Sequence, residues 1–284
     1  MAILFGGSSI MLRFIAFLAA LLAAAPALAQ SQAERTAIDF AIERGRLLYA
    51  VDRAAWVATD DLQAKMSNWR SAGLRGYVVD RDGDGFQVLF YGGPADSPVA
   101  FYRARVANHR VVSSEVFPAE ARVPLTPLQR RLVAAREAAG AAAAASRRRP
   151  CGSRPFNVAV IPPDSADAPV DVYLMTPQER NGEYPFGGHY RVTIAADGSA
   201  SGERAFTNSC LTMSGQAPGG SRGAVMAVSH LLDPVPTEIH VFTSLTSRMG
   251  VMVIIPEPQR FYGVSGDRIE AIATPAKDGR RRRR

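Results

Sequence analysis

Three side chains in the second half of the sequence could act together in catalysis: His189, Glu238 and His240. Alternating apolar and polar residues predict strands over 189–194 and 238–245, with each of these side chains on the polar face of its strand. If the two strands are neighbours, two imidazoles and a carboxylate meet, which would suit an acid/base pair or a zinc site. The spacing matches no established metal motif, so the competing interpretation is a structural polar network without metal or cofactor.

The sequence contains two cysteines, Cys151 and Cys210. An even number of cysteines in an exported protein is typical of a disulfide. A bridge between them would close a loop of about 60 residues and stabilise the fold by about 4 kcal/mol in the chain-entropy model. The alternative is a single catalytic thiol, but neither cysteine belongs to a recognisable cysteine/histidine signature, which favours the bridge.

The segment Asp80-Arg81-Asp82-Gly83-Asp84-Gly85 has the alternating carboxylates and the sixth-position glycine of an EF-hand loop. The twelfth position holds Tyr91, so the bidentate carboxylate that completes such a site is missing. Predicted strands, and not helices, flank the segment. Because Asp and Gly also suit a tight hairpin, the sequence predicts a plain turn here and no calcium site.

Other catalytic and nucleotide-binding motifs are missing from the sequence. The glycine-rich segment 214–223 lacks the Gly-Lys-Ser/Thr ending of a phosphate-binding loop, and no Gly-x-Ser-x-Gly nucleophile motif occurs. Tyr and Phe recur at strand period, which is typical of a protein core and not of a surface for stacking nucleic-acid bases.

The N-terminus has the pattern of a cleavable signal peptide. Arg13 provides the basic region, residues 14–24 are uninterruptedly apolar, and Ala27-Leu28-Ala29 form a small-x-small cleavage site before Gln30. The apolar run is about half the ~20 residues of a membrane-spanning helix. We therefore expect a periplasmic or secreted protein that begins at Gln30 and has no transmembrane segment. Either of the first two methionines could start such a peptide.

The formal net charge of +7 is concentrated at the C-terminus. Without the leader and the tail, basic and acidic residues nearly balance, which argues against nucleic acid as a partner. We expect the tail to be disordered, and the alternative is a weak contact with an anionic surface. The tail consists of Arg280, Arg281, Arg282, Arg283 and Arg284.

Helical periodicity predicts two main helices, over about 35–57 and 127–146. The second should begin with a capping box formed by Thr126 and Gln129 around Pro127. Between the helices, short alternating runs predict a four-strand antiparallel meander, and the second half is again rich in strands. The sequence therefore predicts an α+β fold with mostly antiparallel β-meanders. The meander strands are expected at 76–80, 86–91, 99–106 and 110–117.

The alanine-rich end of the second helix is the best candidate for a boundary between two halves, although the halves could form one continuous domain. The predicted organisation has four parts: the signal peptide 1–29, a helix–meander–helix unit 30–146, a β-rich second half 151–275 and a disordered arginine-rich tail 276–284.

Two classes of function fit these features. The leading hypothesis is a non-catalytic binding or interaction module of the cell envelope, with an envelope protein or a small ligand as its partner. The alternative is a periplasmic hydrolase, with or without a metal, that uses His189, Glu238 and His240. An enzyme should bring these three side chains together in a concave pocket, whereas a binding module should show an exposed apolar patch or a free sheet edge.

Overall fold

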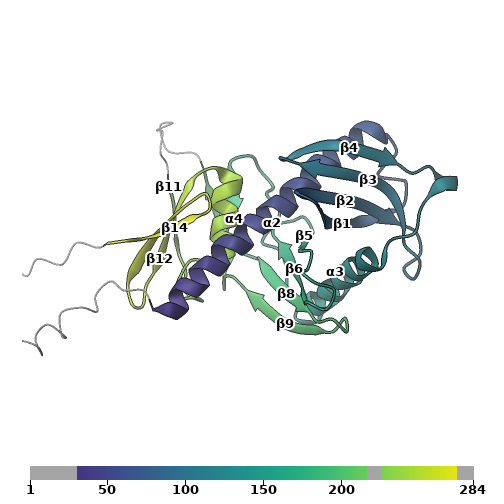
Figure 1. Ribbon diagram of the computed structural model, residues 1–284. Coiled ribbons are helices and arrows are strands. Elements are labelled where there is room, and N and C mark those ends of the chain that lie inside the picture. Colours follow the sequence, from purple (N-terminus) through teal and green to yellow (C-terminus); the bar gives the residue numbers. More distant parts are fainter. Residues whose placement is uncertain (1–30, 216–224, 274–284) are drawn as a thin grey trace, which may run out of the picture.

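The computed structural model describes residues 31–215 and 225–273 (Figure 1). Within these residues the chain forms three α-helices, three four-stranded sheets and a two-stranded ribbon, which confirms the predicted α+β class. No helix in the described ranges is long and apolar enough to cross a membrane. The predicted signal peptide, the arginine tail and most of the segment 214–223 lie outside the described residues.

Helix α2 (Gln32–Lys65) runs past all three sheets and joins the two ends of the molecule (Figure 1). It begins with a capping box, in which Ser31 accepts from the backbone N–H of Glu34 and the Glu34 side chain accepts from the backbone N–H of Ser31. Its buried residues recur every three or four positions, for example Leu48, Val51 and Ala55, and so form one continuous stripe. The helix predicted over about 35–57 is confirmed and continues for two further turns.

The first sheet is the predicted four-strand meander, in the order β1-β2-β3-β4. Each strand pairs antiparallel with the next along the chain, and the turn at Gly83, which has a φ of 59°, joins the first two. The segment 80–85 therefore contains the predicted turn, which connects Asp82 at the end of β1 to Gly85 at the start of β2. The strands are β1 (Leu74–Asp82), β2 (Gly85–Gly92), β3 (Val99–Ala107) and β4 (Arg110–Val116).

Helix α3 (Pro127–Ala145) follows a short 3₁₀ turn, η1 (Ala119–Ala121). Thr126 accepts from the backbone N–H of Gln129, and the Gln129 side chain accepts from the backbone N–H of Thr126. The predicted capping box and the proline in the first turn are both confirmed.

The second sheet has the strand order β5-β6-β8-β9 and is antiparallel throughout. A small antiparallel ribbon pairs β7, which lies between β6 and β8 in the sequence, with β10, which follows β9. The bounds are β5 (Asn157–Val160), β6 (Val170–Met175), β7 (Glu183–Pro185), β8 (Tyr190–Ile194), β9 (Ala200–Ala205) and β10 (Thr212–Ser214).

The third sheet has the order β11-β12-β13-β14. Strands β11 and β12 are parallel, and helix α4 connects them, whereas the remaining pairs are antiparallel. This β-α-β crossover provides the one parallel strand pair in the described part of the chain. The elements are β11 (Val225–Ser229), α4 (Glu238–Ser247), β12 (Gly250–Ile255), β13 (Arg260–Ser265) and β14 (Arg268–Ile272).

The strand predicted over 238–245 is wrong, because this segment is helix α4. Its β-branched and aromatic residues fit an alternating pattern, but they also fit a helical one. Ile239 and Phe242 pack into the core around α2, and Val241 and Leu245 pack into the core of the third sheet. Burial on two sides at helical spacing overrides the local strand preference.

The largest buried cluster contains residues from both sides of the alanine-rich segment. Leu48 and Leu62 of α2 share it with Val88 of the first sheet, Tyr173 of the second sheet and Ile239 of α4. The core around α2 is therefore common to the meander, the second sheet and α4.

The sulfur atoms of Cys151 and Cys210 lie 2.03 Å apart, at the distance of a disulfide, which agrees with the predicted bridge. The backbone N–H of Cys151 donates to the hydroxyl of Thr176, at the end of β6. The bridge thus ties the segment after β9 to the second sheet across a sequence separation of 59 residues.

Removing this bridge should destabilise the protein mainly by freeing the unfolded chain. For a loop of this length we expect the double variant Cys151→Ser/Cys210→Ser to lose about 4 kcal/mol of unfolding free energy and about 10 °C in melting temperature. Calorimetry of the oxidised protein, the reduced protein and the variant checks this. The reduced protein should match the variant, and equal melting temperatures for all three samples would contradict the prediction.

Candidate functional site

Glu238 lies in a buried polar cluster at the first turn of α4, and its residue is 2% exposed. Its Oε1 accepts hydrogen bonds from Nη1 of Arg191 at 2.8 Å and from the hydroxyl of Tyr173 at 3.0 Å. Burial, followed by the nearby Glu238 carboxylate, raises the pKa of Tyr173 well above its usual value, so the phenol remains a donor. The structure therefore brings Glu238 to strand β8 through Arg191 and not through a histidine.

A second carboxylate, Asp171, extends this cluster to α2. It accepts from the hydroxyl of Thr193 at 2.7 Å and lies 4.0 Å from Nε of Arg191 and 3.5 Å from Nη2 of Arg44. The ring of Phe40 packs against both guanidinium groups, whose carbons lie 5.5 Å from the ring centroid. Helix α2, sheet strand β8 and helix α4 are thus held together by one set of charged contacts.

The two histidines of the predicted site are buried and neutral. Nδ1 of His240 accepts from the backbone N–H of Thr237 at 3.0 Å, whereas Nε2 of His189 lies 3.0 Å from the carbonyl oxygen of Pro185 and donates to it. Nδ1 of His189 has no hydrogen-bond partner among the described residues. Burial lowers the pKa of His189 to about 4, and burial followed by repulsion from His230 lowers the pKa of His240 to about 3.

The imidazole that contacts a carboxylate is His230, whose Nε2 lies 2.9 Å from Oδ2 of Asp233. The same oxygen accepts from Nη2 of Arg204 at 2.8 Å. Burial raises the pKa of Asp233, but the hydrogen bonds and charges of His230 and Arg204 outweigh it and lower the pKa overall. The rings of His230 and His240 pack edge to face with centroids 4.8 Å apart. The sequence placed His230 and Asp233 near the predicted polar face, and their spacing of three residues allows this direct contact.

His189, Glu238 and His240 thus lie in one buried region, but no hydrogen bond joins the carboxylate to either ring. No group of three or more His, Cys, Asp and Glu side chains in the described ranges is arranged to hold a metal ion. The contacts of these three residues are those of a structural network, and a catalytic role for them stays a prediction.

A hollow of about 670 Å³ lies beside this cluster, between the N-terminal part of α2 and residues 233–238. Its wall is mostly apolar and includes Phe40 and Val235. The charged residues on the wall, Arg204, Asp233 and Glu238, are all engaged in the ion pairs described above. This hollow therefore offers apolar contact but no uncommitted charge.

Two carboxylates of the segment 80–85, which resembles a calcium-binding loop, are also engaged in ion pairs. Asp82 and Asp84 accept from Nε and Nη2 of Arg105, at 3.1 Å and 2.9 Å. The Arg105 guanidinium, on strand β3, therefore balances the negative charge of these two carboxylates.

The third sheet has one covered face and one uncovered face. Side chains such as Val251, Val253 and Tyr262 are buried against Ile38 of α2 and Val241 of α4. The alternate residues of the same strands point the other way, and we call them the open face. The open face consists of Val225, Ala227, Ser229, Gly250, Met252, Ile254, Phe261, Gly263, Ser265, Arg268, Glu270 and Ile272.

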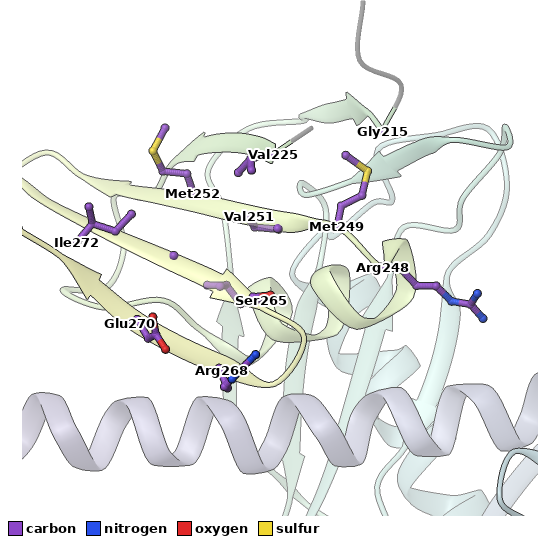
Figure 2. Close-up of a pocket in the computed structure, with 13 residues that line it drawn as sticks. Gly215, Val225, Arg248, Met249, Val251, Met252, Ser265, Arg268, Glu270 and Ile272 are labelled. Carbon is purple, nitrogen blue, oxygen red and sulfur yellow. The ribbon is translucent and has the colours of Figure 1, made fainter. Parts of the chain in front are cut away.

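Two glycines, Gly250 and Gly263, form the floor of a hollow of about 930 Å³ on the open face. Apolar side chains border it, with Val225 57% exposed and Ile272 46% exposed. Figure 2 shows Met252 beside Val225 on neighbouring strands. A Cβ atom on Gly263 would lie 3.7 Å from its nearest neighbour, Cδ1 of Ile272, so the fold itself leaves this space empty.

Charged residues accompany the apolar ones at the edge of this hollow. Arg268 and Glu270 stand two residues apart on β14 and point to the same side of the sheet (Figure 2). Met249 and Met252 add flexible thioether side chains, which adapt readily to different apolar partners. Sequence reasoning missed this surface because β11 was not predicted. The single glycine in each of β12 and β13, Gly250 and Gly263, was the available signal.

No family model matches the chain, and no curated protein matches it. Among solved structures, it is similar to a "putative lipoprotein" from Clostridium difficile 630, with 10% identity over 51% of this chain and 90% of that chain. The TM-score is 0.17, which is too low to carry any argument about fold or function.

The role of Glu238 as a buried counter-charge can be measured directly. Replacing Glu238 by Gln keeps its shape but leaves the Arg191 guanidinium without its closest negative partner, so unfolding free energy at pH 7 should fall by about 3 kcal/mol. Urea denaturation gives the value. Glu270→Gln on the open face is the matched control and should change stability by less than about 0.5 kcal/mol. Equal effects of the two substitutions would contradict the assigned role.

The buried histidines should make the fold sensitive to mild acid. Their pKa values in the folded protein, about 4 and about 3, lie below the usual 6.5, so the unfolded chain binds protons first. The contribution of the neutral rings to the unfolding free energy is fully present above pH 6.5. It should fall by about 1.4 kcal/mol per pH unit for each ring as the pH decreases toward 4.

Chemical denaturation at pH 7.5, 6.0 and 5.0 measures the slope of unfolding free energy against pH. These pH values lie above the range in which most carboxyl groups titrate. His189→Phe removes one of the two rings and should reduce the slope by about half, whatever its effect on stability at pH 7.5. His109→Asn changes an exposed turn residue and should leave the slope as it is. A slope that is the same in all three proteins would show that the buried rings do not cause it.

Proposed function

We propose that this chain is a non-catalytic binding or interaction module of the cell envelope and that it binds its partner through the open face. The observation that carries this proposal is the hollow over Gly250 and Gly263, which has an apolar rim and space that no side chain of the described fold fills. Exposed apolar patches of this kind are typical of interaction surfaces.

An extracytoplasmic location is supported by two independent features. The N-terminus has the pattern of a cleavable leader, and the two cysteines lie at bonding distance. Disulfides persist in oxidising compartments and are rare in the cytosol, so the pair favours a periplasmic or secreted protein.

The alternative, a periplasmic hydrolase, is supported by one contact. Asp233 holds His230 at 2.9 Å, which is how a carboxylate orients a general base. Against it, Asp233 is also paired with Arg204, and the His230 residue is only 2% exposed. The open face is therefore the better supported site.

A fluorescent apolar probe can test whether the open face binds apolar ligands. We expect anilinonaphthalene sulfonate to bind the native protein at micromolar protein concentration, and we expect Gly263→Val to weaken this binding at least fivefold because the side chain fills the hollow. Titration of dye fluorescence at constant protein concentration gives the dissociation constant. Valine is favoured in strands and has room at this position, so the variant should fold normally.

Gly202→Val is the matched control. Gly202 lies on the exposed strand β9, and a Cβ atom there would lie 3.9 Å from the nearest side-chain atom, a similarly open position away from the open face. The control should bind the dye like the original protein. If Gly263→Val also binds it unchanged, the open face is not the binding surface and the proposal fails.

A further inference from the structure

The open face is an apolar sheet surface that nothing in the described part of the chain covers. Domains bury the apolar face of a sheet against another layer, and α2 and α4 do this for the inner face only. On the outer side, Val225 and Ile272 remain about half exposed. The pattern of charge and shape on this face indicates which layer completes it.

The outward side chains form rows across the four strands. Met252 lies next to Gly263, which lies next to Glu270. One step along the strands, Val225 lies next to Gly250, and Ser265 lies next to Arg268. These two adjacent rows therefore end on β14 in opposite charges, Glu270 and Arg268, whereas the third row ends on β14 in the apolar Ile272.

This arrangement is complementary to itself. A twofold axis that lies parallel to the sheet, crosses the strands and passes between Arg268 and Glu270 would place each of these side chains opposite the unlike charge of a second copy. A partner with a uniform charge would instead meet one attractive and one repulsive contact at the same two positions.

The same axis also pairs large side chains with small ones. It exchanges the row of Gly250 with the row of Met252, so the thioether of each copy would enter the hollow over Gly250 of the other. Interdigitation of large and small residues is how two sheet faces pack at about 10 Å. Charge and shape thus select one symmetry operation independently.

We infer that the open face is an interface between two copies of this chain, related by that twofold axis. The inference rests on the proposed function, because it names the partner of the proposed binding surface. Four strands about 4.8 Å apart and five residues of about 3.3 Å each give a footprint of roughly 300 Å². This is small beside the ~800 Å² per partner of a standard interface, so the dimer should be weak, with a dissociation constant of roughly 10–100 µM.

Substitutions that reverse the charges of Arg268 and Glu270, singly and together, provide the test. Sedimentation equilibrium of the full mature protein from about 5 µM to 1 mM should show a monomer–dimer equilibrium. Arg268→Glu and Glu270→Arg each create like charges across the interface, and each should weaken the dimer at least tenfold. The double variant Arg268→Glu/Glu270→Arg restores unlike pairs and should dimerise within about threefold of the original protein.

Both side chains are exposed, so melting temperatures of the variants should agree with that of the original protein. Arg110→Glu, at an exposed position of strand β4, makes the same change in net charge as Arg268→Glu and should leave dimerisation unchanged. This control separates the local contact from the effect of total charge.

Two results would overturn the inference: a protein that stays monomeric up to 1 mM, or single variants that dimerise as well as the original protein. Failure to regain the dimer in the double variant would exclude the stated axis. These outcomes are distinct from failure of the proposed function. A monomeric protein whose dye binding still falls with Gly263→Val would retain the binding surface and lose only the second copy as its partner.

Discussion

The position of α4 against the second sheet and α2 depends on the buried contact between Arg191 and Glu238. Charges removed from water are stable only when they are paired and hydrogen-bonded, so neither side chain can move away without a large loss of free energy. Arg191 belongs to β8, Glu238 begins α4, and the ring of Phe40 on α2 packs against the Arg191 guanidinium. Because α4 also connects β11 to β12 and packs on the third sheet, this contact links the second sheet to the third.

Local signals made the first half of the fold predictable. Thr126 and Gln129 form a capping box that needs only four consecutive residues, and turn residues such as Gly83 separate strands that pair with their neighbours along the chain. These features can be recognised from short stretches of sequence because the contacts that stabilise them are themselves short in sequence.

The segment after residue 225 was less predictable because its contacts are distant in sequence. The sequence of helix α4 fits a strand equally well. The segment is a helix because its side chains are buried between α2 and the third sheet, and α2 begins about 200 residues earlier in the sequence. Strand periodicity placed His189, Glu238 and His240 on polar strand faces and left their meeting to the unknown strand order. In the structure Glu238 reaches β8 through Arg191, and the histidines bond to backbone groups. Residue types indicated polar chemistry there, but only the tertiary arrangement showed which groups neutralise each other.

Glycines that close packing requires can be distinguished from those of the third sheet that it only permits. At Gly92 and Gly187 a Cβ atom would lie 2.3 Å from a backbone oxygen, so close approach of the chain explains these residues. At Gly250 and Gly263 the nearest atoms would be 3.5 Å and 3.7 Å away, which any side chain tolerates. A glycine inside a strand costs roughly 0.5–1 kcal/mol relative to alanine. Close packing within the described fold therefore does not explain glycine at these two positions, and the partner proposed for the open face would use the space above them.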